Sequence, residues 1–95
     1  MAIFEGSFKS KAIRDFYYKG TTKKLPVVNN NKLQDILDYI DSIDSLPPSP
    51  LLYRGHEHVG KGSGTWSFDI TANRRVLCEF DGDIDAINIR IEDPH

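Results

Sequence analysis

Four groups of side chains in this sequence could act on a phosphate ester. They are His56 with Lys61 five residues later, Arg75, the final residue His95, and a basic N-terminal stretch. Histidine titrates near neutrality and can accept or donate a proton, and Lys and Arg stabilise negative charge on phosphate oxygens. Such a set suits metal-free RNA cleavage, in which a 2′-hydroxyl loses a proton, the phosphate gains charge and the 5′-oxygen gains a proton.

Arg75 is the most informative of these residues, because its position in a predicted strand can be deduced. It is out of phase with Val76, Cys78 and Phe80, so its side chain should emerge on the opposite face of the sheet. A strand holds an arginine more rigidly than a loop does. The alternative is a surface arginine that pairs across strands with Glu79 or Asp69.

The pair His56 and His58 also raises the possibility of a metal site. In an extended segment the two imidazoles share a face and could bind one ion. The spacing matches no established zinc pattern, however, and Cys78 is the single cysteine. We therefore expect no metal and no cofactor, and a buried, unreactive Cys78 thiol.

A three-stranded antiparallel meander is predicted for the last thirty-one residues, Thr65 to His95. Three short runs alternate apolar and polar side chains at period two, as half-buried strands do. Ala72-Asn73 and Asp81-Gly82-Asp83 are turn signals between them. The expected apolar faces are Trp66, Phe68 and Ile70, then Val76, Cys78 and Phe80, then Ile87, Ile89 and Ile91.

Two helices should cover this meander. The first is expected at Lys9 to Lys19, with Ala12, Ile13, Phe16 and Tyr17 as its apolar stripe, and Gly20 should end it in the left-handed conformation. The second should begin at a cap on Asn31, with Gln34 in capping-box position. Its apolar stripe is Leu33, Ile36, Leu37, Ile40 and Ile43. Asp35, Asp38, Asp41 and Asp44 form either a solvated acidic face or a docking face for a basic partner.

The remaining segments complete the expected order β-α-α-β-β-β-β. Ile3 to Phe8 and Leu51 to Gly55 are predicted as short strands, and Leu46 to Pro50 as a stiff connector. His56 to Gly64 should be a glycine-rich, solvent-facing loop. The result is an α+β fold, a single domain over residues 1–95, with two N-terminal helices on one face of a mostly antiparallel, twisted sheet.

The charge of −2 is unevenly distributed, with six basic and two acidic residues before Leu25. A local basic patch is therefore compatible with RNA contact, although the overall balance argues against tight nonspecific binding of nucleic acid. The candidates for contact with RNA are Lys9, Lys11, Arg14, Lys23, Lys24, Arg54 and Arg74. The sequence has no apolar run long enough to span a membrane and no signal peptide, so we expect a cytoplasmic protein.

In several segments the sequence resembles the HigB toxins, a branch of the RelE superfamily of bacterial toxin–antitoxin systems. The opening S-F-K-S-K-A-I-R-D-F-Y-Y-K-G and the run L-Q-D-I-L-D-Y-I-D-S-I-D-S-L are similar to the family's first strand and two helices. W-S-F-D-I-T-A-N-R-R-V-L-C-E-F is similar to its W-S-[IV]-x-V-x-x-N-W-R-[IL]-x-F run. The ending I-R-I-E-D-P-H is similar to its terminus Y-E-D-Y-H or V-D-Y-H.

This resemblance implies a RelE-like fold and a ribosome-dependent endoribonuclease that cleaves translated mRNA without a metal ion. It implies a HigA-like helix-turn-helix antitoxin as partner, and binding to operator DNA only through that complex. His56, Arg75 and His95 fall at the family's loop histidine, strand arginine and terminal histidine.

Two positions depart from the family's pattern. Val59 replaces the loop lysine, so that Lys61 would have to assist, and Pro94 replaces the penultimate aromatic. They leave open the alternative of a weakly active or inactive module that binds the antitoxin and possibly the ribosome.

Overall fold

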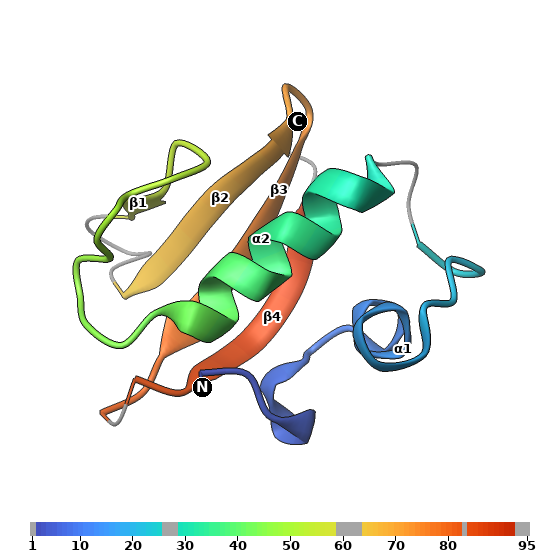
Figure 1. The fold of residues 1–95 in the computed structure, drawn as a ribbon, viewed down its shortest axis with the longest axis horizontal. Helices are drawn as coiled ribbons and strands as arrows, with labels where there is room; N and C mark the ends of the chain where they lie inside the picture. Colours follow the sequence, from blue (N-terminus) through green and yellow to red (C-terminus); the bar gives the residue numbers. More distant parts are fainter. Residues whose placement is uncertain (1, 26–28, 59–63, 83, 93–95) are drawn as a thin grey trace.

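Two helices and a four-stranded sheet make up the computed structural model of this chain (Figure 1). It describes residues 2–25, 29–58, 64–82 and 84–92. The elements are η1 (Glu5–Ser7), α1 (Lys11–Lys19), α2 (Asn30–Ser42), β1 (His56–Glu57), β2 (Thr65–Thr71), β3 (Arg74–Phe80) and β4 (Ala86–Glu92). The predicted α+β class is confirmed, whereas the predictions for Lys61, Asp83 and His95 lie outside the described residues.

The sheet is the predicted antiparallel meander, extended by a short strand at one edge. Its strand order is β1-β2-β3-β4, and every neighbouring pair is antiparallel. Ala72 and Asn73 form the tight turn between β2 and β3, as expected. The apolar faces of β2 and β3 enter the core, where Phe68, Val76 and Cys78 are fully buried.

In β4 the predicted apolar face is partly wrong, because a bulge changes the alternation. Asn88 has a φ of 56°, in the left-handed region, and the register between β3 and β4 shifts between Leu77 and Glu79. Ala86 and Ile89 are therefore the fully buried side chains of this strand, while Ile87 lies outside the core cluster. An extra residue of this kind cannot be read from a regular alternation of residue types.

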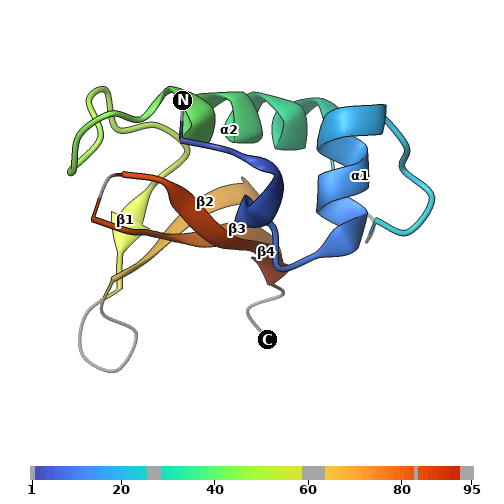
Figure 2. The ribbon, with the colours of Figure 1, turned by 90° about the horizontal axis from the view of Figure 1, so that it is seen from below.

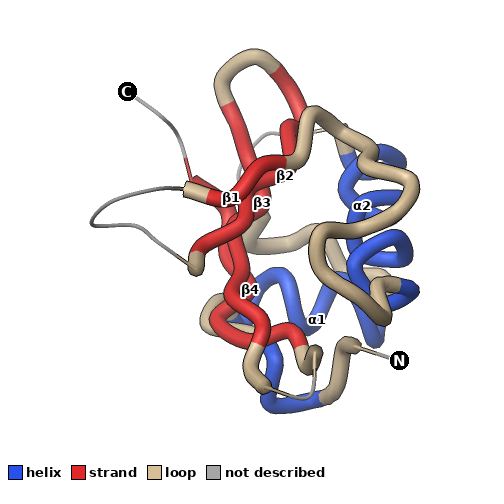
Figure 3. The backbone as a smooth tube through the Cα atoms, turned by 90° about the vertical axis from the view of Figure 1, so that its left-hand side faces the viewer, coloured by secondary structure: helices blue, strands red, loops and turns tan. Residues whose placement is uncertain are grey.

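Both helices lie on the same side of the sheet and supply its cover (Figures 2 and 3). Ile13 and Phe16 of α1 are buried, and Gly20 ends the helix at a φ of 73°, as predicted. The helix begins two residues later than expected, because the Ser10 side chain accepts a hydrogen bond from the Ile13 backbone N–H and caps it. All five residues of the predicted α2 stripe are buried.

The N-terminus and one acidic residue of α2 differ from prediction. Asn29, not Asn31, caps the helix by accepting from the Lys32 N–H, and Gln34 instead donates to Asp38. Asp41 is only partly exposed, and its Oδ1 accepts a hydrogen bond of 2.9 Å from the Ile3 N–H, so it has a structural role in addition to its place on the acidic face. The sequence pattern alone did not reveal a partner 38 residues away.

The two short strands predicted outside the meander are absent. Between Ile3 and Phe8 the chain forms η1, in which the Ser7 hydroxyl accepts from the Phe4 N–H, and only Phe8 pairs with the sheet, by a parallel bridge to Ile89. Leu51 to Gly55 is a turn rather than a strand. Leu46 to Pro50 is irregular, as its prolines predict.

None of the helices in the described part of the chain is long and apolar enough to cross a bilayer.

Candidate active site on the open face of the sheet

The face of the sheet opposite the helices carries a row of polar side chains on neighbouring strands. His56 of β1 lies directly across from Ser67 of β2, and Ser67 lies across from Leu77 of β3. Two residues further along β2, Asp69 lies across from Arg75. Residues i and i+2 of a strand share a face, so Ser67 and Asp69 bring the partners His56 and Arg75 to one surface.

A tight turn places His56 at the start of β1, where the sequence predicted a loop. Tyr53 and Arg54 have φ values of 58° and 51°, and the Asp69 N–H donates to the Tyr53 carbonyl over 2.8 Å. Gly55 follows, where a Cβ would lie 2.6 Å from Cε1 of the Phe68 ring. A side chain at residue 55 would therefore push the segment off β2, so the glycine is needed for the close approach that positions His56.

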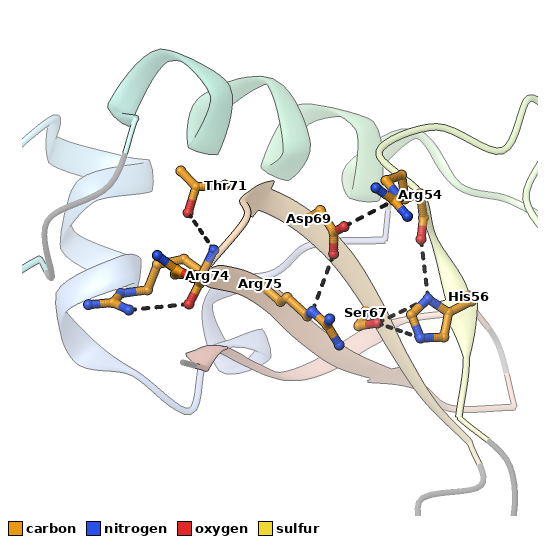
Figure 4. A network of polar contacts seen from close by, with 8 residues as sticks. Arg54, His56, Ser67, Asp69, Thr71, Arg74 and Arg75 are labelled. Atoms are coloured by element: carbon orange, nitrogen blue, oxygen red, sulfur yellow. Dashed lines mark hydrogen bonds and ion pairs between the residues drawn. The ribbon is translucent and has the colours of Figure 1, made fainter. Parts of the chain in front are cut away.

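Asp69 lies between two arginines (Figure 4). Its Oδ1 is 3.4 Å from Nε of Arg75, and its Oδ2 is 3.7 Å from Nε of Arg54. The Arg75 side chain emerges on the face predicted for it. The sequence offered Glu79 or Asp69 as its partner, and the structure shows the pair with Asp69. The Arg75 side chain is 36% exposed and the Arg54 side chain 88%, so both guanidinium groups are open to a ligand from solvent.

Glu79 has a different arginine as its partner. Arg90 Nη1 donates to Glu79 Oε2 over 2.8 Å, and Asn88 Nδ2 donates to Oε1 over 2.9 Å. Burial by itself raises the pKa of the Glu79 carboxyl, but these hydrogen bonds and the Arg90 charge outweigh burial and lower the pKa overall. Glu79 is thus held as a carboxylate beside β4 and is not available to Arg75.

His56 is exposed, and polar groups of Arg54 and Ser67 lie close to its ring nitrogens. Its Nδ1 lies 3.2 Å from the Arg54 carbonyl oxygen. The Ser67 hydroxyl lies 3.4 Å from Nδ1 and 3.3 Å from Nε2. The imidazole is therefore held at the edge of the open face while remaining accessible from outside (Figure 4).

His58 stacks on His56, with ring centroids 5.2 Å apart and planes inclined by 11°. Parallel stacked rings present their faces, rather than converging nitrogen lone pairs, to each other, which is not the arrangement of two ligands on one ion. In the described part of the chain no group of three His, Cys, Asp or Glu side chains is arranged to hold a metal.

The Cys78 thiol is buried in the core, as predicted. Burial raises its pKa to about 12, so the reactive thiolate is strongly disfavoured.

The basic residues predicted for contact with RNA do not form one continuous cluster with His56. Lys11, Lys23 and Lys24 line a pocket of about 240 Å³ beside α1. Helix α1 and strand β1 lie on opposite sides of the molecule in Figure 1. Lys9 is exposed just before α1, and Arg14 pairs with Asp15 at 3.6 Å.

Arg74 begins β3, next to Arg75, and its Nη1 donates to the Asn73 carbonyl over 3.2 Å. Of the four residues predicted as catalytic, the structure brings His56 and Arg75 to one face, whereas Lys61 and His95 lie outside the described residues.

Ser67 is the residue of this face that sequence reasoning missed. It is fully buried, although it is polar and stands on the open side of the sheet. The period-two alternation of β2 places Ser67 on the same face as Asp69. The sequence therefore contained the information that this serine lies on the open face. That it would contact His56 depended on the register of β1, which the sequence did not reveal.

The chain is similar to a known protein over almost its whole length. The chain is 30% identical to Endoribonuclease HigB of Proteus vulgaris over 90 residues, which cover 94% of this chain and 97% of that protein. No protein-family model matches the chain. The aligned region includes almost every element described above, so the likeness concerns the whole fold and not a single motif.

Proposed function

The chain belongs to the HigB family, and from this premise we propose that it is the toxin of a type II toxin–antitoxin system, an endoribonuclease that cleaves translated mRNA on the ribosome without a metal ion. The observation that supports this proposal is that His56 and Arg75 lie on the same open face of the sheet. They are across from Ser67 and Asp69 of β2, respectively. A proton-transfer group and a phosphate-binding cation at one accessible surface are what metal-free RNA cleavage requires.

The proposed roles follow from side-chain chemistry. His56 and His95 share the proton transfers, and Arg75 stabilises the charge that develops on the phosphate. Lys61 assists Arg75. Arg54 shares the Asp69 carboxylate with Arg75 (Figure 4), so it is suited to a phosphate next to the cleaved one. Arg74 precedes Arg75 in β3 and its side chain points away from Arg75 in Figure 4, so its proposed contact is with RNA away from the cleaved phosphate.

The lysines beside α1 have a separate role in this proposal. These residues lie on or beside α1, on the opposite side of the molecule from β1 (Figure 1), so in this proposal they contact ribosomal RNA rather than the cleaved strand. They are Lys9, Lys11, Arg14, Lys23 and Lys24. The protein acts in the cytoplasm, has a RelE-like fold, and is neutralised by a HigA-like helix-turn-helix antitoxin. Operator DNA is bound only through that antitoxin complex.

A second candidate is a module of the same fold that binds antitoxin and ribosome but cuts nothing. The ion pair between Arg75 and Asp69 is the observation that favours it, because a carboxylate at 3.4 Å offsets part of the charge meant for a phosphate. The two functions differ in one measurable property, which is mRNA cleavage.

The test is induced expression in a bacterial host without the antitoxin, followed by primer extension on an abundant mRNA. Wild type is compared with Arg75→Ala and with the matched control Lys32→Ala on α2. We expect new cuts inside translated regions with wild type and control, and a loss of about a hundredfold or more in cut product with Arg75→Ala. Intact mRNA with folded wild-type protein would exclude the nuclease and leave the binding module.

A further inference from the structure

Tyr18 is the most exposed aromatic side chain in the described part of the chain, with 50% of its surface open to solvent. It lies on the outer side of α1. Residues i, i+4 and i+7 of a helix share a face, so Lys11, Asp15 and Tyr18 form one stripe, whereas the buried Ile13 and Phe16 lie on the opposite side. The proposed mechanism gives this ring no role.

Two neighbouring rings hold Tyr18 in place. Its ring centroid lies 5.1 Å from that of Tyr17 and 5.9 Å from that of Phe8, with the planes inclined by 77° and 75°, as in edge-to-face pairs. Phe8 is itself joined to β4 by its bridge to Ile89, so the cluster is anchored to the sheet. An exposed ring that is already fixed loses little conformational freedom when a ligand stacks on it.

Two adjoining hollows surround this ring with charge. The hollow beside Tyr18 has a volume of about 360 Å³, and it meets the lysine pocket of about 240 Å³ at Asp15, which lines both. Asp15 is paired with Arg14 at 3.6 Å, so part of its charge is offset. The two hollows together have five cations and two carboxylates, namely Lys11, Arg14, Lys19, Lys23, Lys24, Glu5 and Asp15.

An exposed aromatic ring among cations is the arrangement that binds single-stranded nucleic acid. The cations meet the phosphates of the strand, and the ring stacks on a base, because every base has a π face. A protein partner could also cover Tyr18, but an excess of cations on both sides of the ring favours a polyanion. The chemistry of this face is therefore that of an RNA strand with an unpaired base.

We propose that Tyr18 is a stacking platform for an unpaired base of ribosomal RNA, with the neighbouring phosphates held by the lysine pocket of Lys11, Lys23 and Lys24. This inference deepens the proposed function and rests on it for the identity of the RNA. It gives α1 a contact with a base in addition to contacts with phosphates. Since α1 lies away from β1, the platform anchors the protein and takes no part in the cleavage step.

Affinity for vacant bacterial ribosomes, measured at several salt concentrations, separates stacking from charge. Tyr18→Leu should weaken binding about tenfold at every salt concentration, because leucine is apolar but has no π face. Tyr18→Phe, which keeps the ring, should bind as wild type does. Lys23→Ala should instead reduce the slope of the salt dependence by about one. Leu51→Ala is the control, because it removes an equally exposed apolar side chain before β1 and should change neither quantity.

A short single-stranded RNA with one 2-aminopurine base reports stacking without the ribosome. Wild type and Tyr18→Phe should quench its fluorescence in a saturable manner, and Tyr18→Leu should not. Should Tyr18→Leu fail to fold, Tyr18→Gln takes its place, since glutamine suits an exposed helix position. The inference is overturned by equal quenching with a folded ring-less variant, or by no quenching with wild type, which is the result expected if this face binds a protein.

Cleavage of ribosome-bound mRNA separates this inference from the proposed function. At saturating ribosome concentration, Tyr18→Leu should cleave at the wild-type single-turnover rate, because the loss is in affinity alone. Wild type that quenches the probe but cleaves no mRNA would defeat the nuclease proposal and leave the stacking platform standing. Wild type that cleaves, with the same ribosome affinity in folded Tyr18→Leu, would defeat the platform alone.

Discussion

Asp69 is the residue that sets the geometry of Arg75. Its two oxygens face Nε of Arg75 and Nε of Arg54, so one carboxylate orients two guanidinium groups while neutralising one positive charge. Orientation and charge have opposite consequences for a phosphate ligand: a well-aimed arginine speeds the reaction, whereas a nearby carboxylate weakens binding. Replacing Asp69 separates the two.

We expect Asp69→Asn to lower the single-turnover cleavage rate by about tenfold without weakening affinity for the ribosome, because Arg75 loses its fixed partner but the face gains positive charge. The measurement is cleavage of ribosome-bound mRNA at several protein concentrations, which yields rate and affinity separately. Asp35→Asn on the exposed side of α2 makes the same change in net charge and should alter neither. A wild-type rate in Asp69→Asn would mean that the pair is an ordinary surface ion pair.

At the scale of elements, β4 is shaped by its bulge. The left-handed Asn88 turns its side chain to Glu79, and Arg90 reaches the same carboxylate from two residues further on. Asparagine tolerates this conformation better than most residues do. The Glu79 carboxylate therefore ties the bulged strand to β3 where the ladder is irregular.

Glu79→Gln should reduce the free energy of unfolding by about 1 kcal/mol at neutral pH, as expected for a partly exposed charged hydrogen bond. The folded-state pKa of Glu79 is lowered, so its contribution is present above the ordinary glutamate pKa of about 4.3 and is lost as pH falls through the lower folded value. Urea unfolding at neutral pH and at about pH 3 tests this. Equal differences at both pH values would contradict it, and Glu5→Gln, at an exposed position of η1, should have little effect at either.

At the scale of the whole molecule, Ala2 and Ile3 join the helical layer to the sheet through hydrogen bonds, and we call these two residues the N-terminal clasp. The Ala2 N–H donates to the Asp41 carbonyl, the Ile3 N–H donates to Asp41 Oδ1, and the Ala86 N–H donates to the Ala2 carbonyl. Ala2 and Ile3 are buried, so these backbone groups have little access to water as a substitute. The end of α2 is joined in this way to the start of β4.

Asp41→Ala should lower the free energy of unfolding by about 2 kcal/mol, because it leaves a buried N–H group without its acceptor. Asp38→Ala, on the same helix, loses only an exposed contact with Gln34 and should cost about 0.3 kcal/mol. Denaturant unfolding of the three proteins makes the comparison. Equal stabilities of the two variants would show that the hydrogen bond from the Ile3 N–H to the Asp41 side chain does not contribute.

Local periodicity by itself determined much of this protein. The alternation in β2 and β3 placed Phe68 and Cys78 in the core and Arg75 on the opposite face, and the apolar stripe of α2 was correct at every position. These features depend on the geometry of one segment, since a strand or helix assigns its own side chains to faces. For the same reason the hairpin at Ala72 and Asn73 followed from neighbouring residues alone.

Only the tertiary structure decided which residues meet across segments. Arg75 pairs with Asp69 and not Glu79, and His56 lies across from Ser67. The Asp41 side chain accepts a hydrogen bond from the Ile3 N–H, 38 residues away in the sequence. Strand register, a bulge at Asn88 and the turn before His56 set these contacts, and each depends on two stretches of chain packing together. A one-residue shift in register exchanges the two faces of a strand, so the site's geometry was a property of the folded sheet rather than of any single segment.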